Sequence, residues 1–262
     1  MLKYFAYFLL FTNILLIFYY NKKKIKKLFY NPKITSVDLE MVDDCFLPDT
    51  IDKKLKSPND AMVIKTFFVP NSWNVIGMTS DYEGWILSVL SKKSLNIFEF
   101  GTCSGKTTYL LSLNSQPEAN ICTITLPPEN ADRIKKDETN DNVAAHRNAM
   151  AESKYDKFMF SNKRIIKEKI KVIFQDSKSF NIEEFKNSFD LIFIDGGHTY
   201  SCVKNDTEKA MKMLKKNGLI FWHDYSIGKR SHKDVYKYLN EIREMYEIYH
   251  IKNTSFCFYK KN

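Results

Sequence analysis

The hydrophobic and polar positions of this chain follow two alternating patterns from about residue 79 onward. Short apolar runs rich in β-branched and aromatic residues predict buried strands, and stretches with apolar residues three and four positions apart predict helices between them. Strands that alternate with helices in this way are typical of an α/β fold with a mostly parallel sheet. The predicted strands are 96–100, 121–126, 170–177, 189–194, 218–222, 246–251 and 255–259.

Capping and stop residues mark the predicted helices. A capping residue precedes the helical spacing of 79–90, and the amphipathic segment 203–216 is followed by Asn217-Gly218 as a stop. The last two predicted strands are joined only by 252–254, so we expect them to form a hairpin. The sequence therefore predicts a seven-stranded, mostly parallel sheet whose last strand is antiparallel.

The N-terminal segment has a different character. Leu2 to Tyr20 is almost wholly apolar, and the basic run Lys22 to Lys27 follows it. At about 1.5 Å per residue, the apolar segment just spans a hydrocarbon layer about 30 Å thick. A cleaved signal would carry its charge before the apolar part, so we predict an uncleaved single-pass transmembrane helix with the remaining chain in the cytoplasm. A peripheral helix that packs on a partner is the alternative.

These patterns predict three parts of the chain. Residues 1–28 form the membrane anchor and its basic flank, 29–78 a linker and cap interrupted by prolines, and 79–262 the α/β domain. Within the domain, about 129–170 is highly charged and lacks strand character, so we expect an insertion with a helix near 142–152. The insertion is either a substrate lid or a solvated excursion, and the sequence leaves both open.

Charge and cysteine content narrow the classes of function. The net charge is +9, and five of the lysines lie just after the apolar segment, where anionic lipid headgroups explain them without a nucleic-acid partner. The five cysteines form no Cys-x-x-Cys pair, so neither a disulfide framework nor a cysteine zinc site is expected. The oligomeric state is left open.

A glycine turn follows the first predicted strand of the domain. The sequence Glu99-Phe100-Gly101-Thr102-Cys103-Ser104-Gly105-Lys106-Thr107 leads from that strand into a helix. An NTPase phosphate loop needs one more residue before Gly-Lys-Thr, and the dinucleotide fingerprint needs glycine at position 103. What remains is Glu-x-Gly-x-x-x-Gly, in which backbone amides at the helix start face a polar group over the turn.

A second constellation lies at the ends of two later strands. Asp195 and His198 follow the strand 189–194, and His223 and Asp224 follow the next strand. A right-handed strand–helix–strand crossover places both strand ends on one edge of the sheet, so these side chains are expected to converge. Such a group of carboxylates and imidazoles can hold a divalent cation or transfer a proton.

Together, the glycine turn and the run Phe-Asp-Leu-Ile-Phe-Ile-Asp-Gly-Gly-His-x-Tyr resemble class I S-adenosylmethionine-dependent methyltransferases, in particular the branch that includes macrocin-type sugar O-methyltransferases. The resemblance covers roughly residues 80–259 and implies a Rossmann-like methyltransferase fold. It implies that the glycine turn and Glu99 hold the methionine part of the cofactor, and that strand-end residues hold the remainder. The implied cofactor-binding residues are Glu99, Gly101, Thr102, Gly105, Thr125, Asp176 and Asp195.

The resemblance also implies catalytic and metal-binding roles. His198 matches a candidate base, with Asp195 as the second catalytic residue, and Asp195 and Asp224 match the acids that hold Mg²⁺ in metal-dependent relatives. Two positions depart from the family: Thr125 stands where an acid usually binds the ribose, and His223 stands where relatives carry a further oxygen ligand.

The predicted function is methyl transfer from S-adenosylmethionine to an oxygen of a small molecule, such as a sugar or a lipid-linked acceptor at the membrane. Three alternatives stay open. The chain is a catalytically silent scaffold if Thr125 marks a lost site, an NTPase if Lys106 binds phosphate, or an enzyme with another reaction on this fold, such as hydroxylation.

Overall fold

The computed structural model describes residues 7, 11–13, 19, 34–38, 64–67, 79–133, 141–226 and 228–262. Residues 34–262 form one compact unit. Nearly all of the predicted anchor, Leu2 to Tyr20, and most of the predicted linker, 29–78, lie outside the described residues. Within the described part, no helix is both long and apolar enough to cross a membrane. The anchor therefore stays a prediction from the sequence.

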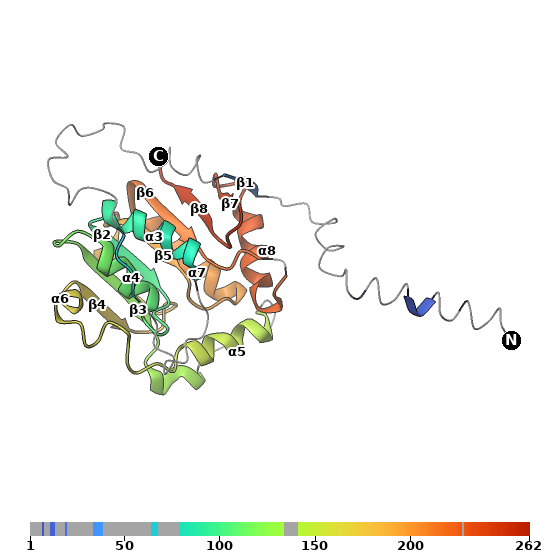
Figure 1. Ribbon diagram of the computed structural model, residues 1–262, viewed down its shortest axis with the longest axis horizontal. Coiled ribbons are helices and arrows are strands. Elements are labelled where there is room, and N and C mark those ends of the chain that lie inside the picture. Colours follow the sequence, from blue (N-terminus) through green and yellow to red (C-terminus); the bar gives the residue numbers. More distant parts are fainter. Residues whose placement is uncertain are drawn as a thin grey trace. The chain divides into compact units, whose positions relative to one another are not determined.

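The described part contains one eight-stranded sheet in the order β1-β7-β8-β6-β5-β2-β3-β4 (Figure 1). Neighbouring strands are parallel except where β8 pairs with β6 and β7. The antiparallel strand near the end of the chain is thus confirmed. The strands are β1 (Thr35–Val37), β2 (Asn96–Phe100), β3 (Asn120–Thr125), β4 (Ile170–Phe174), β5 (Phe189–Ile194), β6 (Leu214–Trp222), β7 (Tyr249–Ile251) and β8 (Cys257–Lys260).

Two predictions about the sheet were wrong. The predicted sheet had seven strands, whereas β1, inside the predicted linker, adds an eighth by pairing with β7. The predicted helix over 203–216 ends at Met213, and β6 begins at Leu214. Asn217 adopts a left-handed backbone with φ of 62°, and the β5–β6 register shifts at this end, so the Asn217-Gly218 break falls within a strand.

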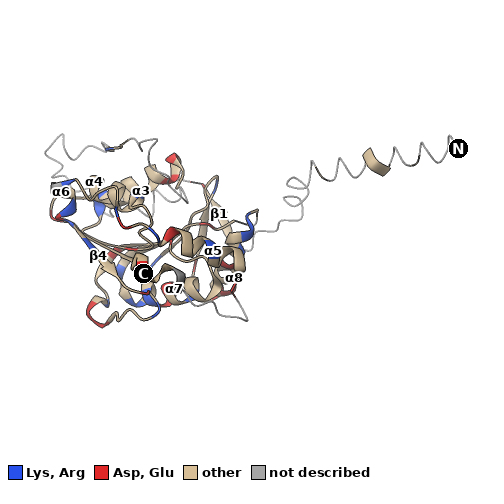
Figure 2. Cartoon of the chain, turned by 90° about the horizontal axis from the view of Figure 1, so that it is seen from below, with Lys and Arg blue, Asp and Glu red and all other residues tan. Residues whose placement is uncertain are grey.

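Helices cover both faces of the sheet. Figure 2 shows α3 and α4 on one side and α7 and α8 on the other. The predicted helix of the insertion is confirmed as α5, which Asn142 caps by accepting hydrogen bonds from two backbone amides. The helices are α3 (Asp81–Lys93), α4 (Lys106–Asn114), α5 (Val143–Glu152), α6 (Arg164–Lys167), α7 (Tyr200–Met213) and α8 (Lys233–Ile242), with 3₁₀ turns η2 (Pro128–Arg133), η3 (Glu183–Phe185) and η4 (Arg230–His232).

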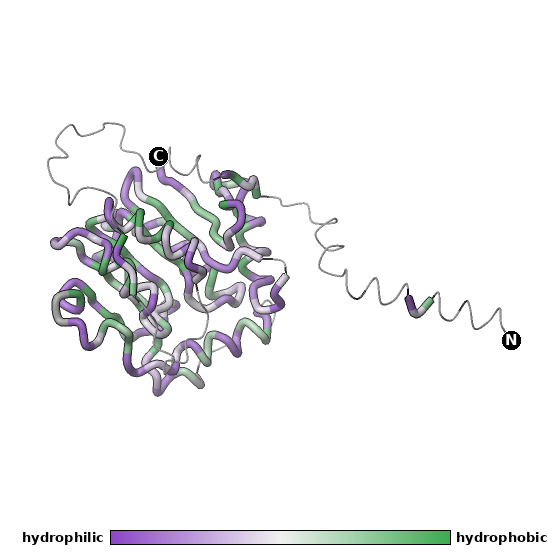
Figure 3. Tube along the Cα trace, viewed as in Figure 1, coloured by the Kyte–Doolittle hydropathy of each residue, from purple (hydrophilic) through white to green (hydrophobic). Residues whose placement is uncertain are grey.

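Alternation along the central strands fills two separate cores. In β2, Ile97 packs in the cluster that contains Leu87 and Leu111 of α3 and α4. Phe98 packs in the opposite cluster with α7 and α8, which includes Met213. Figure 3 shows hydrophobic colours concentrated along the strands and hydrophilic colours along outer loops and helices. Burial of both sheet faces is the arrangement expected of a parallel sheet between helices.

Glu99 is a fully buried acid on the α3–α4 side of the sheet. Its Oε2 accepts a hydrogen bond from Thr108 of α4 and another, at 2.6 Å, from Thr123 of β3. Thr102 of the glycine turn continues the network, with its hydroxyl 2.7 Å from that of Thr123. Burial raises the pKa of Glu99 to about 8, against the two hydroxyl hydrogen bonds, which lower it. Glu99 therefore joins β2, β3 and α4 as a mostly neutral acid at pH 7.

Replacement of Glu99 by Gln tests this role. In the wild-type chain Glu99 releases its proton on unfolding between pH 4.5 and about 8, so the free energy of unfolding falls as the pH rises through this range. Gln keeps the shape but does not titrate. We expect the free energy of unfolding of Glu99→Gln, relative to that of the wild type, to rise by up to about 4 kcal/mol from the lower to the upper pH of that range. Urea unfolding of both proteins at these two pH values measures it. Parallel pH dependences of the two proteins would contradict the assignment.

Candidate active site

The strand order has a switch point between β2 and β5, where the connections begin to run in opposite directions. Ligands of open parallel sheets bind outside the carboxyl ends of the strands at such a point. Backbone hydrogen bonds hold these ends together beyond the strands: the amide of Asp195 donates to Phe100 at 2.9 Å, and the amide of His223 donates to Ile194 at 3.1 Å. Asp195 is therefore fixed between the glycine turn at Gly101 and the end of β6.

The two glycines of the turn are required by different neighbours. Gly101 has φ of 96°, and a Cβ there would lie 2.2 Å from the carbonyl oxygen of Asp195. Gly105 has φ of 75°, and a Cβ there would lie 2.7 Å from the ring of Phe160. Gly101 thus allows the two strand ends to meet, whereas Gly105 makes room for the aromatic side of the insertion.

A cavity of about 360 Å³ lies over the switch point. This volume falls in the range of small-molecule sites. The strand ends of β2 to β5 form its floor, and the end of α5 and the start of α7 contribute walls. Its lining includes Gly101, Cys103, Thr125, Leu126, Glu152, Asp176, Ser177, Asp195 and Asp206.

The residues predicted to bind cofactor fall into two groups. Gly101, Thr125, Asp176 and Asp195 line the larger cavity. The other three residues are not among its lining. Glu99 and Thr102 belong to the buried hydrogen-bond network below the turn, and Gly105 is the N-cap residue that precedes α4. Glu129, the first acid after Thr125 in the sequence, lies on η2 and is not among the lining residues. Thr125 therefore occupies the place where the resemblance implies a ribose-binding acid.

Lys106 does not face the turn as a phosphate-binding lysine would. Its Nζ donates to the backbone oxygen of Thr79 at 2.8 Å, and the neighbouring Thr107 hydroxyl lies 3.2 Å from that of Thr79. These contacts tie the start of α4 to the segment before α3. The geometry therefore gives no support to the NTPase alternative.

A second cavity, of about 180 Å³, shares Cys103, Glu152 and Asp195 with the first. The residues that line it are almost all of polar or charged types. A ligand in one cavity would therefore meet a ligand in the other at Asp195. The remaining lining residues are Asn148, His198, His223, Asp224, Lys229, Ser231 and His232.

The insertion forms part of both cavities, which favours the lid over the solvated excursion. Asp141, just before α5, accepts hydrogen bonds from the amide and hydroxyl of Ser201 at 2.8 and 2.6 Å. Asp234 accepts from the amides of Asn142 and Tyr200 at 2.7 and 3.0 Å. Two buried carboxylates thus fix the start of α5 to the starts of α7 and α8.

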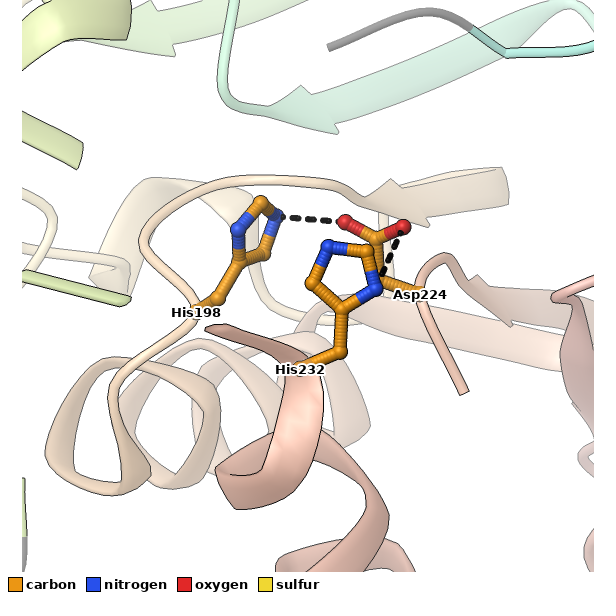
Figure 4. Close-up of side chains that lie close together, drawn as sticks. All are labelled: His198, Asp224 and His232. Atoms are coloured by element: carbon orange, nitrogen blue, oxygen red, sulfur yellow. Dashed lines mark ion pairs between the residues drawn. The ribbon is translucent and has the colours of Figure 1, made fainter. Parts of the chain in front are cut away.

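The predicted constellation at the strand ends is brought together around Asp224. Its Oδ2 lies 3.1 Å from His198 Nε2, and its Oδ1 lies 3.2 Å from His232 Nδ1 (Figure 4). His223 Nδ1 is 3.5 Å from the same Oδ1 and 2.9 Å from Asp195 Oδ1. Asp224 itself has a left-handed backbone, with φ of 64°, which turns the chain sharply after β6.

Charges within this group are strongly coupled. Burial alone would raise the pKa of Asp195, but His223 and His198 lower it to about 2. Burial would lower the pKa of His223, but the nearby carboxylates of Asp195 and Glu83 raise it well above its usual value. Glu83 lies on α3 with Oε2 3.6 Å from His223 Nε2. His223 is therefore a charged link between two carboxylates.

The other two histidines differ in charge. Burial would lower the pKa of His198, but Asp224 and neighbouring acids raise it to about 9. Burial lowers the pKa of His232 to about 4, against the attraction of Asp224. At neutral pH His198 therefore already carries the proton that a base would have to accept. A protonated His198 cannot accept a further proton, which argues against His198 as the base in the chain without ligands.

Mg²⁺ does not fit this donor set well. The predicted pair Asp195 and Asp224 does come together, since their oxygens lie within 4.8 Å of each other and of a His223 nitrogen. Mg²⁺ requires near-octahedral oxygen ligands, but His223 supplies nitrogen and occupies Asp195 with a hydrogen bond. The donor set thus differs from the all-oxygen set that Mg²⁺ prefers.

Three residues of the site were missed in the sequence. His232 lies on η4, Glu83 on α3 and Glu152 at the end of α5. Neither Glu83 nor Glu152 follows a strand, and His232 lies eight positions beyond Asp224 in a stretch without strand pattern. A histidine shortly after a strand-end His-Asp pair was the only signal that pointed to His232.

A family model described as a methyltransferase domain matches residues 98–225, just under half of the chain. This match supports the prediction of a class I S-adenosylmethionine-dependent methyltransferase. It spans the glycine turn, the larger cavity and the chain as far as Tyr225. It stops before His232.

The solved structures that match this chain have low sequence identity to it. A methyltransferase from Podospora anserina bound to S-adenosylhomocysteine is 14% identical over 70% of this chain and 79% of its own, with a TM-score of 0.48. An O-methyltransferase from Bacillus cereus in complex with the same compound is 16% identical over 69% and 80%, with a TM-score of 0.46. No curated protein matches the chain. The fold is therefore defined here by its strand order.

Replacement of Gly101 by Ala tests the contact at the switch point. The added Cβ would meet the backbone of Asp195, and φ at this position is unfavourable for alanine. We expect the free energy of unfolding to fall by more than about 2 kcal/mol. Gly228→Ala is the matched control, because its Cβ would have only the Ser226 hydroxyl nearby, at 3.8 Å; we expect a change below about 0.5 kcal/mol. Equal thermal unfolding of both variants would contradict the close approach.

Proposed function

We propose that this chain transfers the methyl group of S-adenosylmethionine to a hydroxyl oxygen of a small molecule. The observation that carries the proposal is that two cavities share Cys103, Glu152 and Asp195: a larger one over the glycine turn, and a smaller one whose lining residues are almost all polar or charged. A methyl donor and an acceptor bound there would place their reacting atoms together, which is the main requirement of a direct transfer.

The residues of the larger cavity fit the cofactor. Gly101 lines this cavity without a side chain, because only glycine fits against the backbone of Asp195. Thr125 and Asp176, at the ends of β3 and β4, are proposed to bind the ribose and the adenine. Asp195, which His223 and His198 keep ionised, is proposed to attract the positively charged part of the cofactor. The cofactor supplies the methyl group.

The lining of the smaller cavity supports an acceptor rich in hydroxyl groups. Asn148 and Ser231 offer neutral donors and acceptors of hydrogen bonds, and Lys229 offers a cation. Few apolar side chains are present to bind an extended hydrocarbon. This chemistry supports a sugar-like acceptor, which is also the substrate class of the macrocin-type branch that the sequence resembles.

Glu152 is proposed to take up the hydroxyl proton. It lines both cavities, so it lies beside the place where donor and acceptor meet. Burial raises the pKa of Glu152 to about 7, although His198 lowers it in part. A base with a pKa near the working pH exchanges protons most efficiently. In this proposal Asp195 and His198 position the reactants and hold charge.

Incubation of the full chain with sugar acceptors and S-adenosylmethionine carrying a trideuterated methyl group tests the function. We expect a product heavier by one deuterated methyl group; an added oxygen would indicate hydroxylation instead.

Glu152→Gln should lower kcat by about 10²- to 10⁴-fold with little change in KM for the cofactor. The exposed Glu118→Gln is the control. Absence of both product and cofactor binding would favour the silent scaffold, which Thr125 supports.

Action at a membrane is a separate part of the proposal. It rests on the sequence of residues 2–27, an apolar segment followed by a basic run, and would bring the domain to a lipid-linked acceptor. We expect the full chain to sediment with membranes and to remain there in high salt, whereas a chain lacking residues 1–28 stays in the supernatant. Equal partition of the two chains would contradict the anchor.

A further inference from the structure

We infer that His198, Asp224 and His232 form a binding site for a divalent transition-metal ion such as Zn²⁺ or Co²⁺. The three residues come from three different segments: the turn after β5, the end of β6 and η4. Each is at least nine-tenths buried, with exposed fractions of 6%, 7% and 6%. One ligand atom from each lies within 4.8 Å of the others.

The spacing of the ligand atoms fits a metal ion. The carboxylate of Asp224 lies between the rings, with 3.1 Å from Oδ2 to His198 Nε2 and 3.2 Å from Oδ1 to His232 Nδ1 (Figure 4). Ligand atoms about 2.0 to 2.1 Å from a tetrahedral Zn²⁺ are about 3.3 Å from one another. The ligand atoms of the three residues lie within 4.8 Å of one another, so the two imidazole nitrogens would have to approach by up to about 1.5 Å to share one tetrahedral ion.

The ring nitrogens are not satisfied by hydrogen bonds. His198 Nδ1, His198 Nε2 and His232 Nδ1 are buried, and none of them has a hydrogen-bond partner. The two nitrogens that approach Asp224 lie at hydrogen-bonding distance from its oxygens, but without hydrogen-bond geometry. A buried polar atom without a partner costs about 1–3 kcal/mol. A shared metal ion would satisfy both nitrogens at once.

The neighbouring group explains why the site is displaced from the acids expected to hold Mg²⁺. His223 Nδ1 is hydrogen-bonded to Asp195 Oδ1 at 2.9 Å, and its Nε2 faces Glu83. These groups satisfy one another. Two imidazoles and one carboxylate select Zn²⁺, Fe²⁺ or Co²⁺ over Mg²⁺, because Mg²⁺ prefers oxygen ligands and nearly ideal octahedral geometry.

Three protein ligands leave a coordination position for water or a substrate oxygen, as in catalytic zinc sites. All three residues line the smaller cavity, so this position would lie on the acceptor side. Coordination would also use the lone pair of His198 Nε2. His198 is then a metal ligand and not the base, which agrees with the placement of Glu152 as the proton acceptor.

Direct titration of the full chain, free of any polyhistidine tag and stripped with a chelator, tests the site without cofactor or acceptor. We expect one equivalent of Co²⁺ to bind with visible absorption bands typical of four or five ligands, and Zn²⁺ to displace it. His232→Gln, which removes Nδ1 but keeps the volume, should weaken binding by more than about 100-fold. The matched control His146→Gln, on α5, should bind as the wild type does.

Three results would overturn the site. The first is that His232→Gln and His198→Gln both still bind Co²⁺. The second is that Cys103→Ser loses Co²⁺ binding, and the third is that equimolar Mg²⁺ displaces Co²⁺. Circular dichroism of each variant establishes that it is folded, and Cys103 is included because its thiol lines the same cavity. The readout is metal content and absorption, so it is independent of methyl transfer. A chain that binds metal but not S-adenosylmethionine would contradict the proposed function and leave this site in place.

Discussion

The close approach of Gly101 to the backbone of Asp195 is the constraint on which the site depends. It occurs at the switch point of the sheet, where β2 and β5 are neighbours but their connections run in opposite directions. Because no side chain fits between the two strand ends, the glycine turn and the first acid of the charged group share one edge. The larger cavity lies over this contact, and the smaller one shares Cys103, Glu152 and Asp195 with it. Backbone geometry at the strand ends of a parallel sheet thus brings the two cavities together.

The charged group beyond this contact holds several elements in place. His223 links Asp195 at the end of β5 to Glu83 at the start of α3, and Asp224 lies between His198 and His232. Removal of one member would leave a buried charge without its partner, which is costlier than the loss of the pair itself. The donor set differs from that of an oxygen-only magnesium site, and this difference is what leads to the proposed transition-metal site.

Local pattern predicted the central strands, because β2 to β5 are short apolar runs, and it predicted α5 from Asn142 and the helical spacing after it. The crossover rule predicted the convergence of Asp195 and Asp224. The start of β6 was missed because Lys215 and Lys216 continue the pattern of a polar helix face, and β1 is too short to give a pattern. His232 and Glu83 reach the site only through the packing of η4 and α3, which one sequence does not reveal.

Calorimetric titration of the full chain with S-adenosylmethionine, S-adenosylhomocysteine, ATP and NAD⁺ tests the central claim most directly, because the claim is that the switch-point cavity holds the methyl donor. We predict that the first two compounds bind with a Kd of about 1 μM to 100 μM, and that ATP and NAD⁺ bind far more weakly because the turn lacks their phosphate-binding spacing. Failure of S-adenosylmethionine to bind, or equal binding of ATP, would contradict the account.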